Sequence, residues 1–234
     1  MIVRTLHDSI QLIAQPDHAR LAGRVIEHAA ALAHQPRRQS ILRAAYGHDN
    51  GWLEPDAAPI LLPGTGRVAD FINAPVDLRQ GVWPRGVATL SDDAWAAALV
   101  AQHAIAVYDR FHRDPAWAAF FERMTSIRDR LIAGSGLSLD DLRADYSFVR
   151  LADLISLSFC TGSTDRFPHG HSTVQLIGTR VVITPDLFGG VTVSLEIDAL
   201  VLPKRTFESE ADLRTAIAVA GTTTLRGEAT GMDR

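Results

Sequence analysis

The sequence predicts a mainly α-helical protein with a small antiparallel β region, which makes it α+β overall. Between residues 16 and 160, apolar residues recur at the three- and four-residue spacing of helices that bury one face. Residues 172–229 are instead rich in β-branched residues divided by turns, and residues 1–15 contain two short strand-like runs. We therefore expect one domain over residues 1–234, with a helical core at 16–160 and an accessory β region at 1–15 and 172–229.

The N-terminal elements follow from local sequence. The runs IVRTL and IQLIA predict two strands joined by a hairpin turn. A first helix is expected to open at Pro16 and to end before Pro36. A second is expected from about Ser40 to Gly47. Residues 53–90 are dense in proline and glycine, which predicts a long connection.

The middle of the chain predicts three more helices. A polar cap at residues 91–93 opens a helix that runs through Phe111, and Asp114-Pro115 starts the next one. A glycine-rich break at residues 134–136 separates these from a fifth helix, which spans roughly 138–160.

The last third of the chain predicts mostly antiparallel strands. The β-branched runs are STVQLIG, RVVIT, VTVSLEI and LVLPKRTF, and one short helix is expected at EADLRTAIAVA. We expect these strands to form a small sheet that covers one side of the helical core and pairs with the N-terminal hairpin.

The composition excludes several kinds of chemistry. The chain has 9 histidines but a single cysteine, Cys160, and a single lysine, Lys204. An intramolecular disulfide and a cysteine-based zinc site are therefore excluded. A net charge of −4 without a basic stripe predicts that nucleic acid is not a partner. Because no window approaches about 18 uninterrupted apolar residues, we expect no membrane partner and a cytoplasmic location.

Two polar side chains interrupt the apolar faces of predicted helices. Asp153 lies one turn after Val149 on the stripe of the fifth helix, and His103 lies one turn after Leu99 on the third. A buried carboxylate costs several kcal/mol unless it is paired or bound to a metal. The ordinary explanation for Asp153 is an ion pair with Arg150, and the ordinary explanation for His103 is a satisfied core histidine.

Other candidate ligands stand at helix ends. His18 opens the apolar stripe of the first helix, and His48 and Asp49 end the second, where adjacent side chains need not diverge. Each has an ordinary structural explanation when taken singly. Together with His103 and Asp153, however, they are nitrogen and oxygen donors that separated helices can bring to one divalent ion.

This order of residues resembles the HD superfamily of metal-dependent phosphohydrolases. The matching residues are His18 in QPDHARLAG, His48-Asp49 in YGHDNGW and Asp153 in RLADLISL. More closely, these segments together with MIVR, Asp70-Phe71, His103 and ADLISLSFC resemble a bacterial family, domain-of-unknown-function family 3891, over most of the chain. The chain departs from the HDDGW of that pattern by carrying Asn50.

The HD resemblance implies a helical HD-like core and a hydrolase that acts on a small phosphate ester or nucleotide through metal-activated water. It also implies that His18, His48, Asp49 and Asp153 bind a first metal, with Asp49 bridging to a second. His103 would ligate the second ion or act as a general acid, since an unperturbed histidine pKa is about 6.5. Catalysis is thus expected from His103 and Asp49, with a divalent manganese, iron, nickel, zinc or magnesium ion as cofactor.

Arginine is expected to bind the substrate. Because lysine is nearly absent, a small anionic or polar substrate would be held by the metal and by arginine. Arg20 and Arg150 each lie close in sequence to a proposed ligand, and Arg150 has an alternative role as the partner of Asp153.

Two other functions stay open. An HD-type diiron oxygenase that acts on a small polar substrate would use the same scaffold, although no histidine between His48 and His103 completes a second iron site. A noncatalytic ligand-binding protein would use the polar cluster structurally. A homodimer through an exposed sheet edge is a further expectation. The two-residue spacing of His169 and His171 would also suit a second metal site, but we expect a solvated loop, placed where it can cover the pocket mouth.

Overall fold

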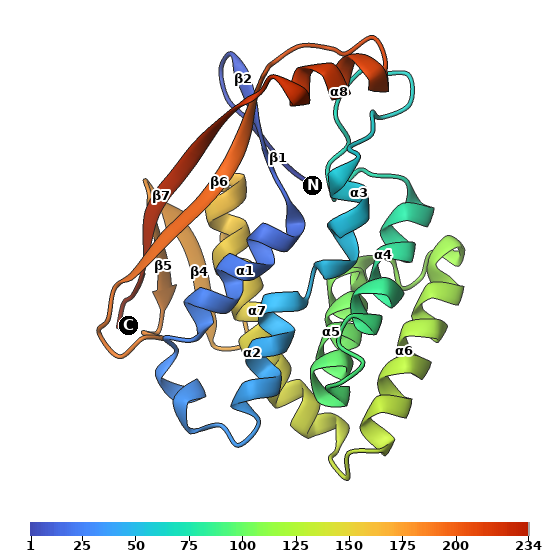
Figure 1. Cartoon of the computed structure of the whole chain (residues 1–234). Coiled ribbons are helices and arrows are strands. Elements are labelled where there is room, and N and C mark those ends of the chain that lie inside the picture. Colours follow the sequence, from blue (N-terminus) through green and yellow to red (C-terminus); the bar gives the residue numbers. More distant parts are fainter. Residues whose placement is uncertain (234) are drawn as a thin grey trace.

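A bundle of helices packs against one large sheet in the computed structural model, which describes residues 1–233 (Figure 1). The sheet has 7 strands in the order β1-β2-β6-β7-β5-β4-β3. The strands are β1 Ile2–Thr5, β2 Ser9–Ile13, β3 Arg166–His169, β4 Ser172–Ile177, β5 Arg180–Thr184, β6 Val193–Pro203 and β7 Gly221–Gly231. Neighbouring strands are antiparallel except for β5 and β7, which run parallel.

The expected fold class, a mainly α HD-like core with a small antiparallel β region, is wrong. The sheet is a mixed sheet and forms a substantial part of the fold, and its long strands β6 and β7 curve across one side of the helices (Figure 1). β7 was not among the expected strands because Ala229 is its one buried residue, so the strand has no apolar alternation to detect. The expected pairing of the N-terminal hairpin with the C-terminal strands is confirmed, since β2 pairs with β6.

The five helices expected from periodicity and caps are present, but the first ends at Ile26 rather than just before Pro36, and the third ends at Val107 rather than Phe111. The helices are α1 Gln15–Ile26, α2 Arg38–Gly47, α3 Leu53–Ala57, α4 Val76–Ala88, α5 Ala94–Val107, α6 Ala118–Ala133, α7 Leu139–Thr161 and α8 Glu210–Ala218. Short 3₁₀ turns are η1 Ala30–His34, η2 Asn50–Trp52, η3 Asp109–Phe111 and η4 Pro115–Trp117. The Asp93 side chain caps α5 by accepting from the amide of Ala96 at 3.0 Å, as the polar cap had predicted.

Two helices, α3 and α4, lie in the segment that was expected to be a connection. α4 forms although Pro84 lies inside it, a position that locally disfavours a helix. Its backbone packs directly on η2, because a Cβ added to Gly51 would lie 1.8 Å from the carbonyl oxygen of Val82. This contact between distant segments outweighs the local preference and carries Trp83 to the ring of His103, with centroids 5.6 Å apart.

α7 is the central element of the fold. It contacts α1, α2 and α5 on one side and β1, β3, β4 and β5 on the other (Figure 1). Because both sides are covered, most of its residues are buried, including the carboxylates of Asp145 and Asp153. Its N-terminus is fixed by a capping box between Ser138 and Asp141.

The start of α1 is fixed by a buried carboxylate from α3. Asp56 accepts the backbone N–H of Gln15 at 2.6 Å and pairs with the amine of Met1. These bonds satisfy donors at the helix N-terminus and position His18 one turn into the helix.

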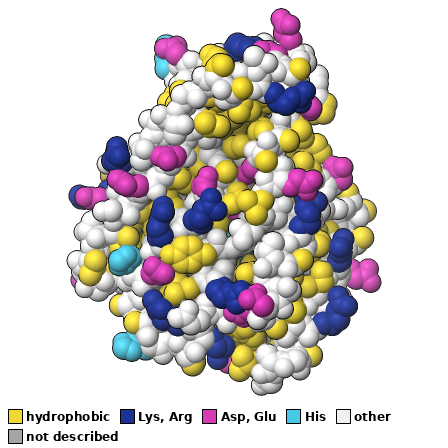
Figure 2. Space-filling model, viewed as in Figure 1, with side chains coloured by type: hydrophobic (Ala, Val, Ile, Leu, Met, Phe, Trp, Pro, Cys, Tyr) yellow, Lys and Arg dark blue, Asp and Glu magenta, His cyan; other side chains and the backbone are white. Residues whose placement is uncertain are grey.

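The surface mixes charges of both signs. On the face shown in Figure 2, basic and acidic side chains are interspersed, with apolar side chains between them. No helix within residues 1–233 has the length and apolar content that a membrane span requires.

Candidate metal centre

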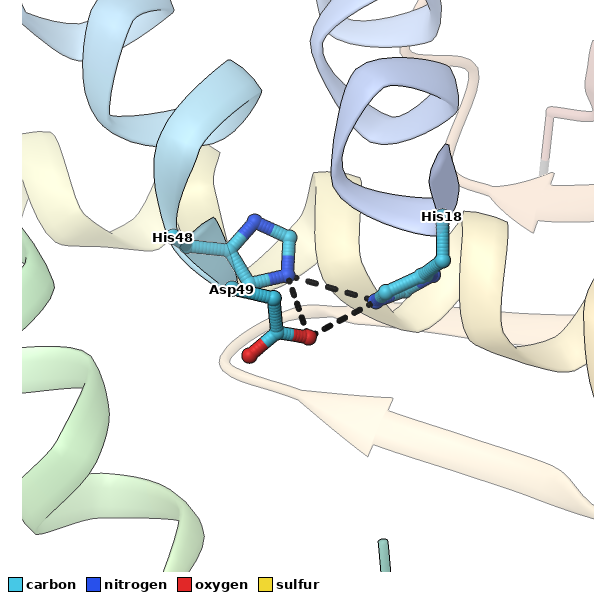
Figure 3. Close-up of side chains that lie close together, drawn as sticks. All are labelled: His18, His48 and Asp49. Carbon is cyan, nitrogen blue, oxygen red and sulfur yellow. Dashed lines mark hydrogen bonds and ion pairs between the residues drawn. The ribbon is translucent and has the colours of Figure 1, made fainter. Parts of the chain in front are cut away.

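The ends of α1 and α2 bring three of the expected ligands together (Figure 3). The Nε2 atoms of His18 and His48 lie 3.2 Å apart. Asp49 Oδ2 lies 3.6 Å from the first nitrogen and 3.5 Å from the second. The backbone of Asp49 is no longer helical, with φ −109° and ψ 15°. Its side chain therefore turns to the same point as that of His48. The expectation that a helix end allows both neighbours to converge is thus met.

Asp153 of α7 faces the same point from the opposite side. Its Oδ1 lies 3.2 Å from His18 Nε2 and 3.6 Å from His48 Nε2. Its Oδ2 pairs with Arg150 and lies 3.9 Å from His103 Nε2. The structure therefore brings all five expected metal-ligating residues together in the interior.

Hydrogen bonds on the far sides of the rings determine which nitrogens carry protons. His48 Nδ1 lies 2.8 Å from the carbonyl oxygen of Ala45, which can only accept, so Nδ1 is the donor. The hydroxyl of Ser156 donates to the carbonyl of His18, and its oxygen lies 2.8 Å from His18 Nδ1, which therefore donates to it. In the neutral rings, both Nε2 atoms carry lone pairs that face each other.

Two facing lone pairs at 3.2 Å require a positive charge between them. In a tetrahedral site with metal–nitrogen bonds of about 2.1 Å, two ring nitrogens would lie roughly 3.4 Å apart, close to the separation of these two atoms. Imidazole nitrogens and carboxylate oxygens are also donors that divalent transition metals accept. The distances and the chemistry of His18, His48, Asp49 and Asp153 therefore fit a divalent cation.

The pKa values show how the cluster behaves with protons alone. Burial lowers the pKa of His48, but Asp49 and Asp153 outweigh it and raise this pKa to about 9. Burial also opposes ionisation of Asp153, but the nearby rings of His18 and His48 and the charge of Arg150 take the pKa of that carboxyl well below its usual range. A proton on His48 thus takes the position that a cation would otherwise hold.

His103 differs from the other two histidines. Burial takes its pKa well below the usual value, and the charge of Asp153 offsets this only in part. The ring is therefore neutral at pH 7. A neutral imidazole suits the role of metal ligand or proton acceptor better than that of a general acid, which would have to carry the proton beforehand. Its Nδ1 lies 3.1 Å from the hydroxyl of Tyr146, which orients the ring.

Among residues 1–233, two overlapping groups of side chains could hold a metal ion. One consists of His18, His48 and Asp49, and the other of His48, His103 and Asp153. Because His48 Nδ1 is occupied by Ala45, only its Nε2 can ligate, and it belongs to both groups. The two groups therefore compete for one nitrogen of His48 and are not independent sites.

The cluster lies on the floor of a cavity of about 420 Å³. His18, Asp49, His103 and Asp153 line it at the buried end, and the exposed side chains of Ile72 and Arg110 line it where it meets solvent. The apolar and aromatic residues of its walls are Trp52, Phe71, Trp83, Val107, Tyr108, Leu154, Leu157 and Phe167.

The two arginines expected to bind substrate have different positions. Arg150 lines the cavity and pairs with Asp153, so both of its proposed roles are compatible with its place. Arg20 does not line the cavity. It is exposed, pairs with Asp17 and borders a separate groove between α1 and strands β6 and β7.

Sequence reasoning missed Arg110 of η3, which lines the cavity. No local signal distinguishes it from its neighbour Arg113, because its position depends on where α5 ends and η3 begins. Asn50, the departure from the family pattern, is not among the cavity-lining residues.

The loop at His169-Gly170-His171 connects β3 and β4, and His169 is half-buried. Burial and the nearby charge of Arg150 lower the pKa of His169. Phe167 of the same strand lines the cavity, so this hairpin lies beside the cavity rather than fully in solvent.

The comparisons with known proteins give one family. A profile of the family described as "Protein of unknown function (DUF3891)" matches residues 1–204. The chain belongs to this family. The DUF3891 match spans β1 through β6 and therefore includes every residue of the candidate metal centre. Neither the curated proteins nor the solved structures give a match.

Proposed function

We propose that this member of DUF3891 is a metal-dependent hydrolase of the HD type that acts on a small phosphate ester or nucleotide. The facing Nε2 atoms of His18 and His48, beside two buried carboxylates, carry this proposal. Structural metals are enclosed by their protein ligands, whereas catalytic metals keep a position open. This cluster borders a cavity of about 420 Å³, which leaves room for water and substrate.

The charges of the cluster favour an anionic substrate. With a proton on His48, the charges of His48 and Arg150 balance those of Asp49 and Asp153. A divalent cation in place of that proton leaves the cluster with excess positive charge in a region of low dielectric constant. A phosphate ester would neutralise this excess, and a neutral substrate would not.

Each residue has a role that its position allows. A bound divalent cation supplies Lewis acidity and lowers the pKa of water. Asp49 and Asp153 orient their oxygens toward the ring nitrogens and would hold the ion there. Arg150 holds Asp153 and presents its remaining N–H groups to phosphoryl oxygens in the cavity. His103, neutral and held by Tyr146, accepts a proton or completes the ligand set.

The proposed partner is a small molecule, with neither nucleic acid nor membrane involved. The net charge of −4 and the interspersed charges on the face shown in Figure 2 support this, because binding to a phosphate backbone needs a continuous basic surface. The overlap of the two ligand groups at His48 weighs against the diiron oxygenase, which needs two full sites. A homodimer and a cytoplasmic location stay predictions.

The test begins with the metal-free protein reconstituted separately with Mn²⁺, Fe²⁺, Ni²⁺, Zn²⁺ and Mg²⁺. We expect about one ion per chain and metal-dependent release of phosphate from a panel of phosphate monoesters and nucleotides. His48→Ala should abolish both, whereas His28→Ala, which changes an exposed histidine after α1, should abolish neither.

The other functions predict other results. Two irons per chain with substrate-dependent oxygen uptake would replace the hydrolase with the oxygenase. Bound metal without turnover of any panel member would favour the noncatalytic protein, and a chain that retains no metal after reconstitution would refute both enzyme functions.

A further inference from the structure

The walls of the cavity above the metal centre are mainly apolar. Trp52 and Trp83 are buried in them, and Phe71 and Phe167 enter from two segments far apart in the sequence. Ile72 also lines the cavity although it is 52% exposed, so apolar surface continues to the mouth. Such walls bind a flat apolar group better than a sugar, whose hydroxyls would lose hydrogen bonds to water.

Arg110 provides a positive charge at the mouth that no carboxylate neutralises. It is exposed, lines the cavity and, within residues 1–233, forms no ion pair. Its guanidinium carbon lies 4.8 Å from the ring centroid of Phe111, a contact that leaves its N–H groups available. Arg150, the other arginine of the cavity, is committed to Asp153.

One acidic side chain, Asp165, also lines the cavity near its exposed end. It follows α7 and accepts the hydroxyl of Ser163 at 2.9 Å, whereas Arg110 belongs to η3 after α5. The two charges therefore come from different walls, and they form no ion pair with each other. Arg110 remains free to bind an anion.

We propose, on the basis of the hydrolase function above, that the substrate is a phosphate monoester of an aromatic alcohol that also carries a carboxylate. The phosphoryl group would lie at the buried metal centre, the aromatic ring between the apolar walls, and the carboxylate against Arg110. The planar fork of arginine matches a carboxylate with two parallel hydrogen bonds. Hydrolysis adds water across the P–O bond and yields inorganic phosphate and the carboxylated alcohol.

The cavity volume agrees with a substrate of this size. Sites for small molecules occupy about 300–1,000 Å³, and this cavity measures about 420 Å³. One aromatic ring with two anionic ends fits within that volume, whereas a folded protein segment does not.

Non-hydrolysable phosphonates test the proposal by binding alone. Calorimetry on the Mn²⁺-loaded protein would compare 2-hydroxyethylphosphonate, benzylphosphonate and two carboxylated benzylphosphonates, one with 4-carboxy and one with 4-(2-carboxyethyl). We expect the benzyl compound to bind about 10-fold more tightly than the hydroxyethyl compound, from burial of the ring. At least one carboxylated compound should bind roughly 10-fold more tightly again, from its charged hydrogen bonds to arginine.

Matched variants test whether Arg110 causes the higher affinity of the carboxylated compounds. Arg110→Gln should abolish the gain in affinity of the carboxylated compounds over benzylphosphonate when both are measured on the variant. Arg113→Gln changes an exposed arginine that does not line the cavity and should leave all affinities unchanged. The proposal is overturned if no carboxylated compound gains affinity, if Arg110→Gln retains the gain, or if none of the phosphonates binds.

Phosphate release measured on the same preparations separates this proposal from the hydrolase function. Turnover of glycerol phosphate without any preference for aromatic carboxylates would refute the substrate class alone. The predicted order of affinities without turnover of any ester would refute hydrolysis and retain the binding role of Arg110.

Discussion

Two buried aspartates on the same helix have opposite environments. Asp145 and Asp153 of α7 are 1% and 4% exposed. Asp145 accepts hydrogen bonds from Arg37 Nε at 2.5 Å and from Trp95 Nε1 at 2.8 Å, groups that always donate. Asp153 also accepts from an arginine, Arg150, with one oxygen. Its other oxygen, however, faces the ring nitrogens of His18 and His48, whose other nitrogens already donate elsewhere.

The difference shows that burial of a carboxylate does not by itself identify a functional site. The donors around Asp145 carry fixed hydrogens, so the carboxylate is satisfied and its role is structural. The ring nitrogens that face Asp153 lack hydrogens in their neutral form, so the cluster needs either a proton on His48 or a cation. Asp153 also borders a cavity, which Asp145 does not.

Replacing Asp145 should affect stability most. Asp145→Ala leaves the Trp95 indole N–H without its acceptor and Arg37 without its buried partner, which should lower the free energy of unfolding by about 3 kcal/mol. Urea unfolding of the metal-free protein measures this loss. Metal affinity of the folded variant should equal that of the wild type, and a parallel loss of metal would contradict the distinction between the two aspartates.

Asp153→Asn should affect metal affinity, which Asp145→Ala leaves unchanged. The substitution removes a charged oxygen that faces His18 and His48, so metal affinity should fall at least about 100-fold, beyond the roughly 10- to 100-fold typical of residues that only orient ligands. Competition with a chelating dye measures the dissociation constant. If Asp153→Asn binds metal as tightly as Asp145→Asn, this aspartate is not a ligand.

Ser156→Ala tests the assignment of the His18 tautomer. Without the hydroxyl, Nδ1 of His18 loses its acceptor, so the ring can reorient or place its proton on Nε2. We expect roughly 10- to 100-fold weaker metal binding in the same dye assay. Ser158→Ala is the matched control, because its hydroxyl donates only to Leu154 within the same helix. Equal affinities in the two variants would contradict the assigned tautomer.

Arg20→Gln should have the smallest effect. Its ion pair with Asp17 is exposed and lies in the groove outside the cavity, so the free energy of unfolding should change by less than about 0.5 kcal/mol. Phosphate release should also match the wild type, whereas Arg150→Gln should reduce it. A strong loss of activity in Arg20→Gln would restore the substrate role that its sequence position suggested.

The local sequence was sufficient to predict helices whose caps and apolar periodicity lie within a short stretch of chain. The cap at Asp93, the capping box at Ser138 and the apolar stripe of α7 are short-range features, so α5 and α7 could be predicted. The same periodicity exposed His103 and Asp153 as polar interruptions. α4 and β7 could not be found this way, because a contact at Gly51 and pairing with distant strands stabilise them.

The sequence by itself determined the identities of five metal-ligating candidates and their places on helices or helix ends, because periodicity and helix breaks are encoded within a few residues. Only the tertiary structure decided that Arg150 and Arg110 line the cavity and that Arg20 lies outside it. It also decided the extent of the sheet, since strand pairing depends on residues far apart in the chain. The environments of Asp145 and Asp153 differ for the same reason: each is set by side chains from other helices.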